Sequence, residues 1–159
     1  MLGPVLEETT IALDNDVFTY WRKGNGPILQ AVSEYIRKHK SPPALPSVTI
    51  FEAIYGLRKK SDEQWNLNQV IQQDLRRTQG FAASCTVLDF NYAAAEIAAF
   101  VCGRLSKNMS KDLMRDVFIA SIALAHGHGI ATWNRKDFEL IAANLPPDYT
   151  ILRIATWNR

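Results

Sequence analysis

The chain has 159 residues, a length that fits one domain spanning 1–159 and that allows a sizeable buried core. Its composition is that of a globular protein, with 47% hydrophobic and 21% charged residues, and its net charge of +2 gives no overall argument for binding nucleic acid. The N-terminus shows no basic segment followed by a hydrophobic block, and no apolar run approaches about 18 residues. We therefore expect a cytoplasmic protein without a membrane span.

Strands and helices are predicted to alternate along the first half of the chain. Asp14 ends the first strand abruptly, and Gly24 stops the first helix. Two segments, 49–52 and 61–64, match the capping box that opens a helix. The predicted elements are a strand at 10–13, helices at 17–23 and 27–40, a strand at 45–48, a helix from 49 to about 60, and a polar helix from 61 to about 79.

The second half continues the alternation and contains the most apolar helix of the chain. That helix runs from Met114 to Ala125 and ends in the turn sequence HGHG, after which Asn134 is predicted to cap a helix beginning at Lys136. The other predicted elements are strands at 85–88, 129–132 and 149–154, a helix at 93–105 and a polar link at 106–111. Such alternation is typical of an α/β layered domain with a mostly parallel sheet.

Acidic side chains stand near the predicted carboxyl ends of strands, where ligands of parallel sheets bind. Asp14 directly follows a strand, Glu52 and Asp137 lie shortly after strands, and Asp116 begins the apolar helix. Each also has a structural interpretation as a helix cap, a capping-box partner or a first-turn residue. A set of carboxylates suits a hard divalent cation such as Mg²⁺ or Mn²⁺, which binds phosphate oxygens and activates water.

Four motifs in order along the chain resemble the PIN domain, and most closely the VapC-type ribonuclease toxins of prokaryotic toxin–antitoxin pairs. They are LDND at 13–16, SVT at 47–49 with Glu52 beyond it, DVFIASIALAHG at 116–127, and TWNRKDF at 132–138. The resemblance extends from about Ile11 to Ile154. No single motif is specific, but their order is.

The resemblance implies a three-layer α/β/α sandwich with a central, mostly parallel sheet and a metal-dependent endoribonuclease. Asp14 and Asp116 would be the main metal ligands, with Glu52 and Asp137 completing the Mg²⁺ or Mn²⁺ site directly or through water. Products would carry 5′-phosphate and 3′-hydroxyl ends. The polar residues Thr132 and Asn134 would shape the pocket. A homodimer and a small antitoxin protein that occupies the acidic cleft are implied as partners.

Two features depart from the family pattern. The family usually has Ser or Thr and then Asn after the first Asp, whereas this chain has Asn15 and Asp16. Asp16 either adds a fifth carboxylate or caps the next helix. The second feature is a repeat, because IATWNR occurs at 130–135 and again at 154–159. Duplication, a reading-frame effect and coincidence are all compatible with it, and we assign the second copy no catalytic role.

Binding of RNA phosphates is predicted for Arg135 and Lys136, the cations nearest the proposed site. Two other functions fit parts of the sequence. Asp14 and Asp16 resemble the D-x-D start of haloacid-dehalogenase-type phosphatases, although Phe18 replaces the usual Thr or Val and no Gly-Asp-x-x-x-Asp follows near the C-terminal end. The other is a non-catalytic PIN fold that binds RNA or protein, against which the complete acidic set argues.

Overall fold

The computed structural model describes residues 9–63, 68–149 and 151–158. Strands and helices alternate in it, as the sequence predicted. The strands are β1 (Ile11–Leu13), β2 (Leu45–Pro46), β3 (Val87–Leu88), β4 (Gly129–Thr132) and β5 (Ile154–Thr156). The helices are α2 (Asn15–Arg22), α3 (Gly26–His39), α4 (Ser47–Glu63), α5 (Asn68–Ser84), α6 (Tyr92–Arg104), α7 (Lys107–Asp112), α8 (Met114–Ala125) and α9 (Arg135–Ala142). No helix in the described part of the chain is long and apolar enough to cross a membrane.

The described strands are all paired in parallel. β1 pairs with β4 and β4 with β5, while β2 pairs with β3. Two backbone hydrogen bonds join these groups: Leu13 N donates to Ala44 O at 3.0 Å, and Ala44 N donates to Ile11 O at 2.9 Å. The strand order is therefore β3-β2-β1-β4-β5. The strands β2 and β3 follow β1 on one side, and β4 and β5 lie on its other side, so the order of successive strands reverses at β1. In parallel sheets such a reversal opens a crevice at the carboxyl ends of the strands.

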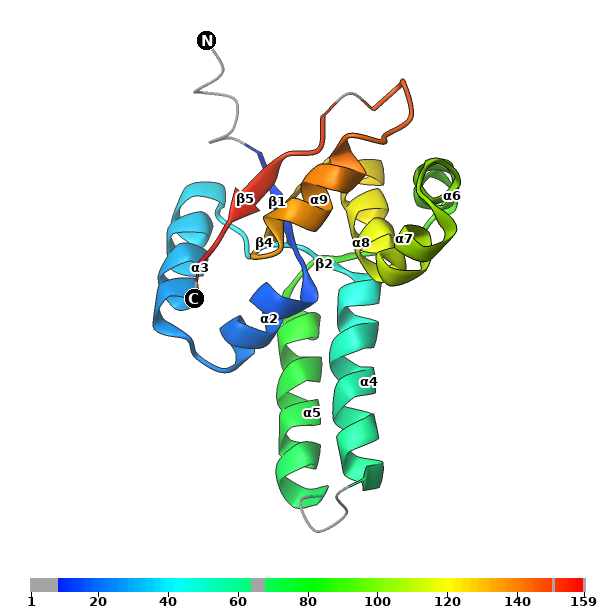
Figure 1. Ribbon diagram of the computed structural model, residues 1–159. Helices are drawn as coiled ribbons and strands as arrows, with labels where there is room; N and C mark the ends of the chain where they lie inside the picture. The colour runs from blue at the N-terminus through cyan, green and yellow to red at the C-terminus, as the bar shows by residue number, and fades with distance from the viewer. Residues whose placement is uncertain (1–8, 64–67, 150, 159) are drawn as a thin grey trace.

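Side chains of the central strands enter two separate hydrophobic clusters. Ile11 and Leu13 of β1 pack with α2 and α3, whereas Ala12 packs with α6 and α8 on the opposite face. In β4, Ala131 packs in the same cluster as Leu13, and Ile130 packs in the same cluster as Ala12. Successive residues of a strand point to opposite faces, so helices cover both sides of the sheet (Figure 1). The predicted three-layer α/β/α arrangement is confirmed.

Several predicted boundaries were wrong near α4. The helix begins at Ser47 and not at Thr49, because β2 already ends at Pro46. The hydroxyl of Thr49 donates to Leu13 O at 2.8 Å and so ties α4 to the end of β1. The box predicted at 61–64 was also wrong, since α4 continues through Glu63 and the next helix begins at Asn68; position 64 itself lies outside the described residues.

The predicted link at 106–111 is largely helical. Ser106 accepts a hydrogen bond from Met109 N at 3.3 Å and thereby caps α7. The strand predicted at 85–88 is confined to Val87–Leu88, and the last strand lies at Ile154–Thr156 and not at 149–154. Leu152, in the apolar segment that suggested a strand, is instead buried in the cluster beneath α8 and α9.

The shifted last strand places the two copies of IATWNR side by side. Ile130 lies opposite Ile154, Ala131 opposite Ala155 and Thr132 opposite Thr156, so each residue meets its own counterpart. The guanidinium of Arg135 donates to Ile154 O at 3.0 Å and to Thr156 Oγ1 at 3.4 Å. The first three residues of the second copy therefore form a strand of the central sheet.

Candidate active site

The end of β1 supplies the most deeply buried carboxylate. Asp14 is 4% exposed and caps α2, because its Oδ1 accepts from Val17 N at 2.9 Å. Its Oδ2 accepts a hydrogen bond from the Thr132 hydroxyl at the end of β4. Adjacent parallel strands end at the same edge of a sheet, and β1 is the strand at which the chain reverses, so Asp14 and Thr132 meet at the crevice. Asp14, and not Asp16, is therefore the residue that caps α2.

The loop after β4 positions the next carboxylate. Thr132 Oγ1 accepts from Asn134 N at 2.9 Å, and Asn134 Nδ2 donates to Asp137 Oδ2. Asn134 occupies the N-cap position of α9, but its side chain makes no capping hydrogen bond. The predicted position of the cap was therefore right, but the predicted capping hydrogen bond was wrong, because the side-chain amide of Asn134 donates to Asp137.

The remaining two carboxylates come from two different helices. Glu52 lies in α4 and Asp116 lies in the first turn of α8. Arg115 Nη1 lies 3.7 Å from Glu52 Oε2, so α8 also supplies a counter-ion for the carboxylate of α4. Arg115 was not predicted as part of the site, because its only signal in the sequence is its position directly before Asp116.

The pKa values show that these carboxylates share one electrostatic environment. Burial raises the pKa of Asp14 to about 7, and the charges of Asp16 and Asp116 add to that effect. Burial likewise raises the pKa of Asp116 to about 6, with Asp137, Glu52 and Asp16 contributing. The pKa of Glu52 is also raised by burial, against the opposing effect of Arg115. Asp16 thus acts as a fifth, exposed carboxylate of the cluster.

The cluster fits a divalent cation in its chemistry, although its side chains are engaged with protein donors. Among the described residues, no three His, Cys, Asp or Glu side chains are gathered as a ready ligand shell for one ion. Glu52 faces Arg115, Asp137 accepts from Asn134, and Asp14 accepts from Thr132. Carboxylate oxygens that repel one another, one group buried and three half-buried, are nevertheless the donors that a hard cation prefers, since the cation would relieve their repulsion.

The raised pKa values predict an unusual pH dependence of stability for the metal-free protein. Between the ordinary Asp value of 3.8 and about 7, Asp14 is protonated in the folded chain but ionised in the unfolded chain. The folded state then binds more protons, so the free energy of unfolding decreases as pH rises through this window. Urea unfolding in EDTA at pH 5, 6, 7 and 8 measures it. Stability that increases steadily over that range would contradict the assignment.

The two predicted phosphate contacts differ in their surroundings. Arg135 is held by Glu139, whose Oε1 lies 2.7 Å from Nε, as well as by β5. Lys136 is exposed in the first turn of α9. Of the two, Lys136 is the side chain that its neighbours leave available to a ligand.

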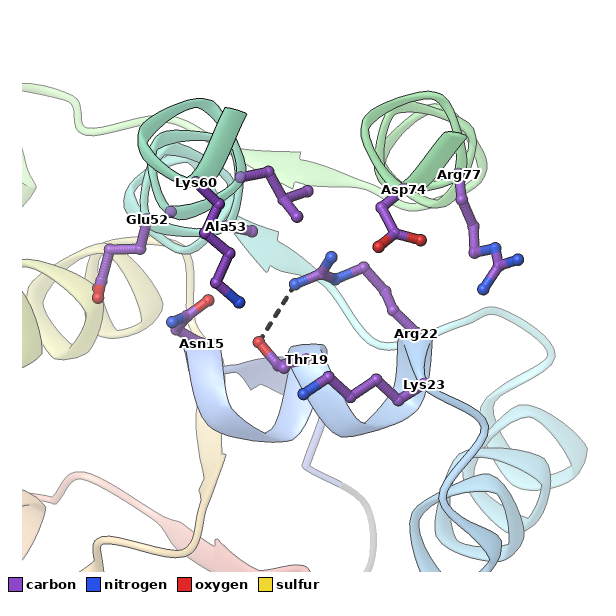
Figure 2. A pocket seen from close by; sticks show the side chains of 11 residues that line it. Asn15, Thr19, Arg22, Lys23, Glu52, Ala53, Lys60, Asp74 and Arg77 are labelled. Carbon is purple, nitrogen blue, oxygen red and sulfur yellow. Dashed lines mark hydrogen bonds between the residues drawn. The ribbon is translucent and has the colours of Figure 1, made fainter. Parts of the chain in front are cut away.

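A pocket adjoins the cluster between α2, α4 and α5 (Figure 2). Asn15 and Glu52 line it, so the pocket shares Glu52 with the carboxylate cluster, while Asp14, Asp116 and Asp137 are not among its lining residues. Its other lining residues include the cations Arg22, Lys23, Lys60 and Arg77. Sequence analysis attributed none of these cations to the site, because they come from helices that are separated in the chain.

Comparisons with known proteins identify the family and the fold. The chain is 27% identical over 120 residues to the tRNA(fMet)-specific endonuclease VapC of Shigella flexneri, covering 76% of this chain and 85% of that protein. Its fold is similar to DNA-bound VapBC from Salmonella typhimurium (TM-score 0.71, 24% identity, 94% of this chain and 99% of that one). It is also similar to promoter-bound VapBC2 from Rickettsia felis (TM-score 0.66, 18% identity, 94% and 99%). The PIN domain model matches residues 11–144, so the chain belongs to the PIN domain family.

Proposed function

We propose that this protein is a metal-dependent endoribonuclease of the VapC type. The observation that carries the proposal is the shared environment of Asp14, Glu52, Asp116 and Asp137, at the crevice where the chain reverses across the sheet. Family membership supports a nuclease, and the similarity to a tRNA-specific endonuclease supports RNA as the substrate. The phosphatase interpretation of Asp14 and Asp16 has no such support.

The proposed roles of the side chains come from the resemblance of the sequence to the family, and their contacts support the positioning roles. Asp14 and Asp116 would be the main ligands of Mg²⁺ or Mn²⁺, with Glu52 and Asp137 completing the site. The bound ion would activate a water molecule and neutralise charge on the scissile phosphate. Thr132 orients Asp14, and Asn134 orients Asp137, so both are positioning residues. Arg115 partly neutralises Glu52 and has to be displaced from it, or shared, when Glu52 binds a cation.

Similarity to toxin–antitoxin complexes supports a partner protein. The similar structures from Salmonella typhimurium and Rickettsia felis are both VapBC assemblies bound to DNA. We therefore include a small antitoxin among the partners of this chain. A homodimer is proposed on the resemblance of the sequence alone.

The proposed activity is tested by incubating purified protein with mixed tRNA and rRNA in Mg²⁺, in Mn²⁺ and in EDTA. We expect cleavage in the presence of either metal, products with 5′-phosphate and 3′-hydroxyl ends, and no cleavage in EDTA. A phosphomonoester substrate is assayed in parallel. Hydrolysis of that ester without RNA cleavage would favour the phosphatase, and binding of RNA without any hydrolysis would favour a non-catalytic module.

A further inference from the structure

The pocket between α2, α4 and α5 has more cations than acidic side chains, although it adjoins the carboxylate cluster through Glu52. Four of its lining side chains are cations, and only Glu52 and Asp74 are acidic. Figure 2 shows Glu52 directed away from the middle of the pocket, whereas Arg22 and Lys60 point into the space between the helices. Asp74 faces Arg22 in the same view, so the cations outnumber the acidic side chains of the pocket by four to two but are partly offset by Asp74.

Arg22 is fixed in the wall of the pocket. Its Nη1 donates to Thr78 Oγ1 at 2.8 Å, and its Nη2 donates to Thr19 Oγ1 at 3.2 Å. Its Nε is buried and finds no acceptor among the described residues. Burial lowers the pKa of Arg22, while the charge of Asp74 opposes that effect. A guanidinium remains charged under these conditions, so an anion in the pocket would offset the cost of its burial.

The other cations form no ion pairs with the carboxylates whose side chains the structure describes. Lys60 and Arg77 are exposed, and neither forms an ion pair with a carboxylate whose side chain the structure describes. Lys23 lies over the ring of Tyr20, with its Nζ 5.6 Å from the ring centroid. Cations from three helices thus surround a volume of about 200 Å³, which accommodates a phosphate group but not a duplex.

We propose that this pocket holds a backbone phosphate of the RNA strand, one that neighbours the scissile phosphodiester. The inference rests on the proposed nuclease function. Its basis is proximity, because Glu52 lines the pocket and interacts with the charges of Asp14 and Asp16, and Asn15, which stands between these two residues in the chain, also lines the pocket. An acidic cluster repels RNA, and a cationic pocket beside it offsets that repulsion and fixes which phosphate enters the cluster.

Adjacent arginines of α5 provide a matched test. Arg77 lines the pocket, whereas Arg76 is exposed among Asn68, Gln69, Gln72 and Gln73 in a different groove. Binding of a fluorescently labelled single-stranded RNA to the whole protein is measured in EDTA, over 50 to 200 mM NaCl. Arg77→Ala is expected to weaken binding about 10-fold and to reduce the slope of log affinity against log salt by about 0.7, whereas Arg76→Ala leaves both close to wild type. Arg77→Lys should restore most of the slope.

A second variant adds a negative charge to the pocket and keeps all four cations. A Cβ built on Gly56 of α4 meets no atom within 4 Å, and Gly56 lines the pocket, so Gly56→Glu adds a carboxylate at the pocket from a position with open space around its Cβ. Replacing a glycine within a helix favours folding. We therefore expect Gly56→Glu to weaken RNA binding at least as much as Arg77→Ala, with an unchanged or higher Tm.

The outcomes separate this inference from the proposed function. Equal RNA binding by Arg77→Ala and Arg76→Ala overturns the pocket assignment, whether or not the wild type cleaves RNA. The same conclusion holds if neither the wild type nor the variants bind RNA. A selective loss in Arg77→Ala together with no cleavage in Mg²⁺ or Mn²⁺ retains the pocket and overturns the nuclease. A poly-glutamate peptide is titrated alongside. If Arg77→Ala weakens binding of the peptide but not of RNA, the pocket belongs to a protein ligand and the inference fails.

Discussion

Asp116→Asn is expected to lower the rate of RNA cleavage on the order of 10²–10³-fold, the scale of losing one electrostatic contact to a transition state. The change keeps the size of the side chain but removes one charge from the cluster. Because the pKa of Asp116 is raised to about 6 in the folded protein, ionisation at pH 8 costs folding free energy. The variant should therefore unfold at an equal or higher urea concentration than wild type in EDTA at pH 8.

The matched control is Asp112→Asn, which makes the same chemical change on an exposed residue at the end of α7. Cleavage by this variant should remain within about twofold of wild type, because surface substitutions away from special features have small effects. Full activity in Asp116→Asn would remove Asp116 from the metal-binding set. Loss of activity accompanied by loss of stability would show that the residue serves folding instead.

Phe18→Ala is expected to produce the largest loss of stability, about 3–5 kcal/mol. Phe18 is fully buried in α2, and its ring lies edge-on to Trp21 and Phe81 with centroids 6.4 Å away in each case. The Arg22 guanidinium lies 4.9 Å from the same ring. Truncation leaves a cavity beneath the helix that Asp14 caps, and the loss is comparable to the whole stability of a marginal domain.

Urea unfolding measures this loss, and Phe100→Ala is its control. Phe100 is 37% exposed in α6, where its ring contacts the Arg104 guanidinium at 5.7 Å. Its truncation should cost at most about 1 kcal/mol, since it removes a partly exposed contact. Similar losses in the two variants would mean that the cluster around Phe18 is not a principal source of stability.

The sequence predicted the features that depend on local pattern. Asp14 directly follows a short apolar strand, and both its place at the strand end and its role as a helix cap follow from neighbouring residues. The alternation of strands and helices indicated a parallel sheet, because a parallel crossover requires an intervening helix. Placement of Thr132 beside Asp14 needed only the further assumption that their strands end at one edge of the sheet.

Features that depend on partners distant in the chain were wrong or missed. Thr49 and Glu52 have the spacing of a capping box, but Thr49 binds the carbonyl of Leu13 and Glu52 pairs with Arg115. Neither partner is visible from a local pattern. The last strand was predicted too early for the same reason, since pairing with β4 selects Ile154–Thr156 over the equally apolar segment before it.

The repeated segment has a consequence for association between molecules. β5 ends the described strand order, so its outer edge presents the same residues in the same direction that β4 presents to β5. Identical strands stacked in parallel register are the arrangement from which fibrils are built, and an open edge of this kind is a template for a further copy. β5 has only three residues, and such shortness is one of the means by which proteins limit growth at an edge. The short length of β5 thus limits the addition of further copies to an edge whose sequence can pair with itself.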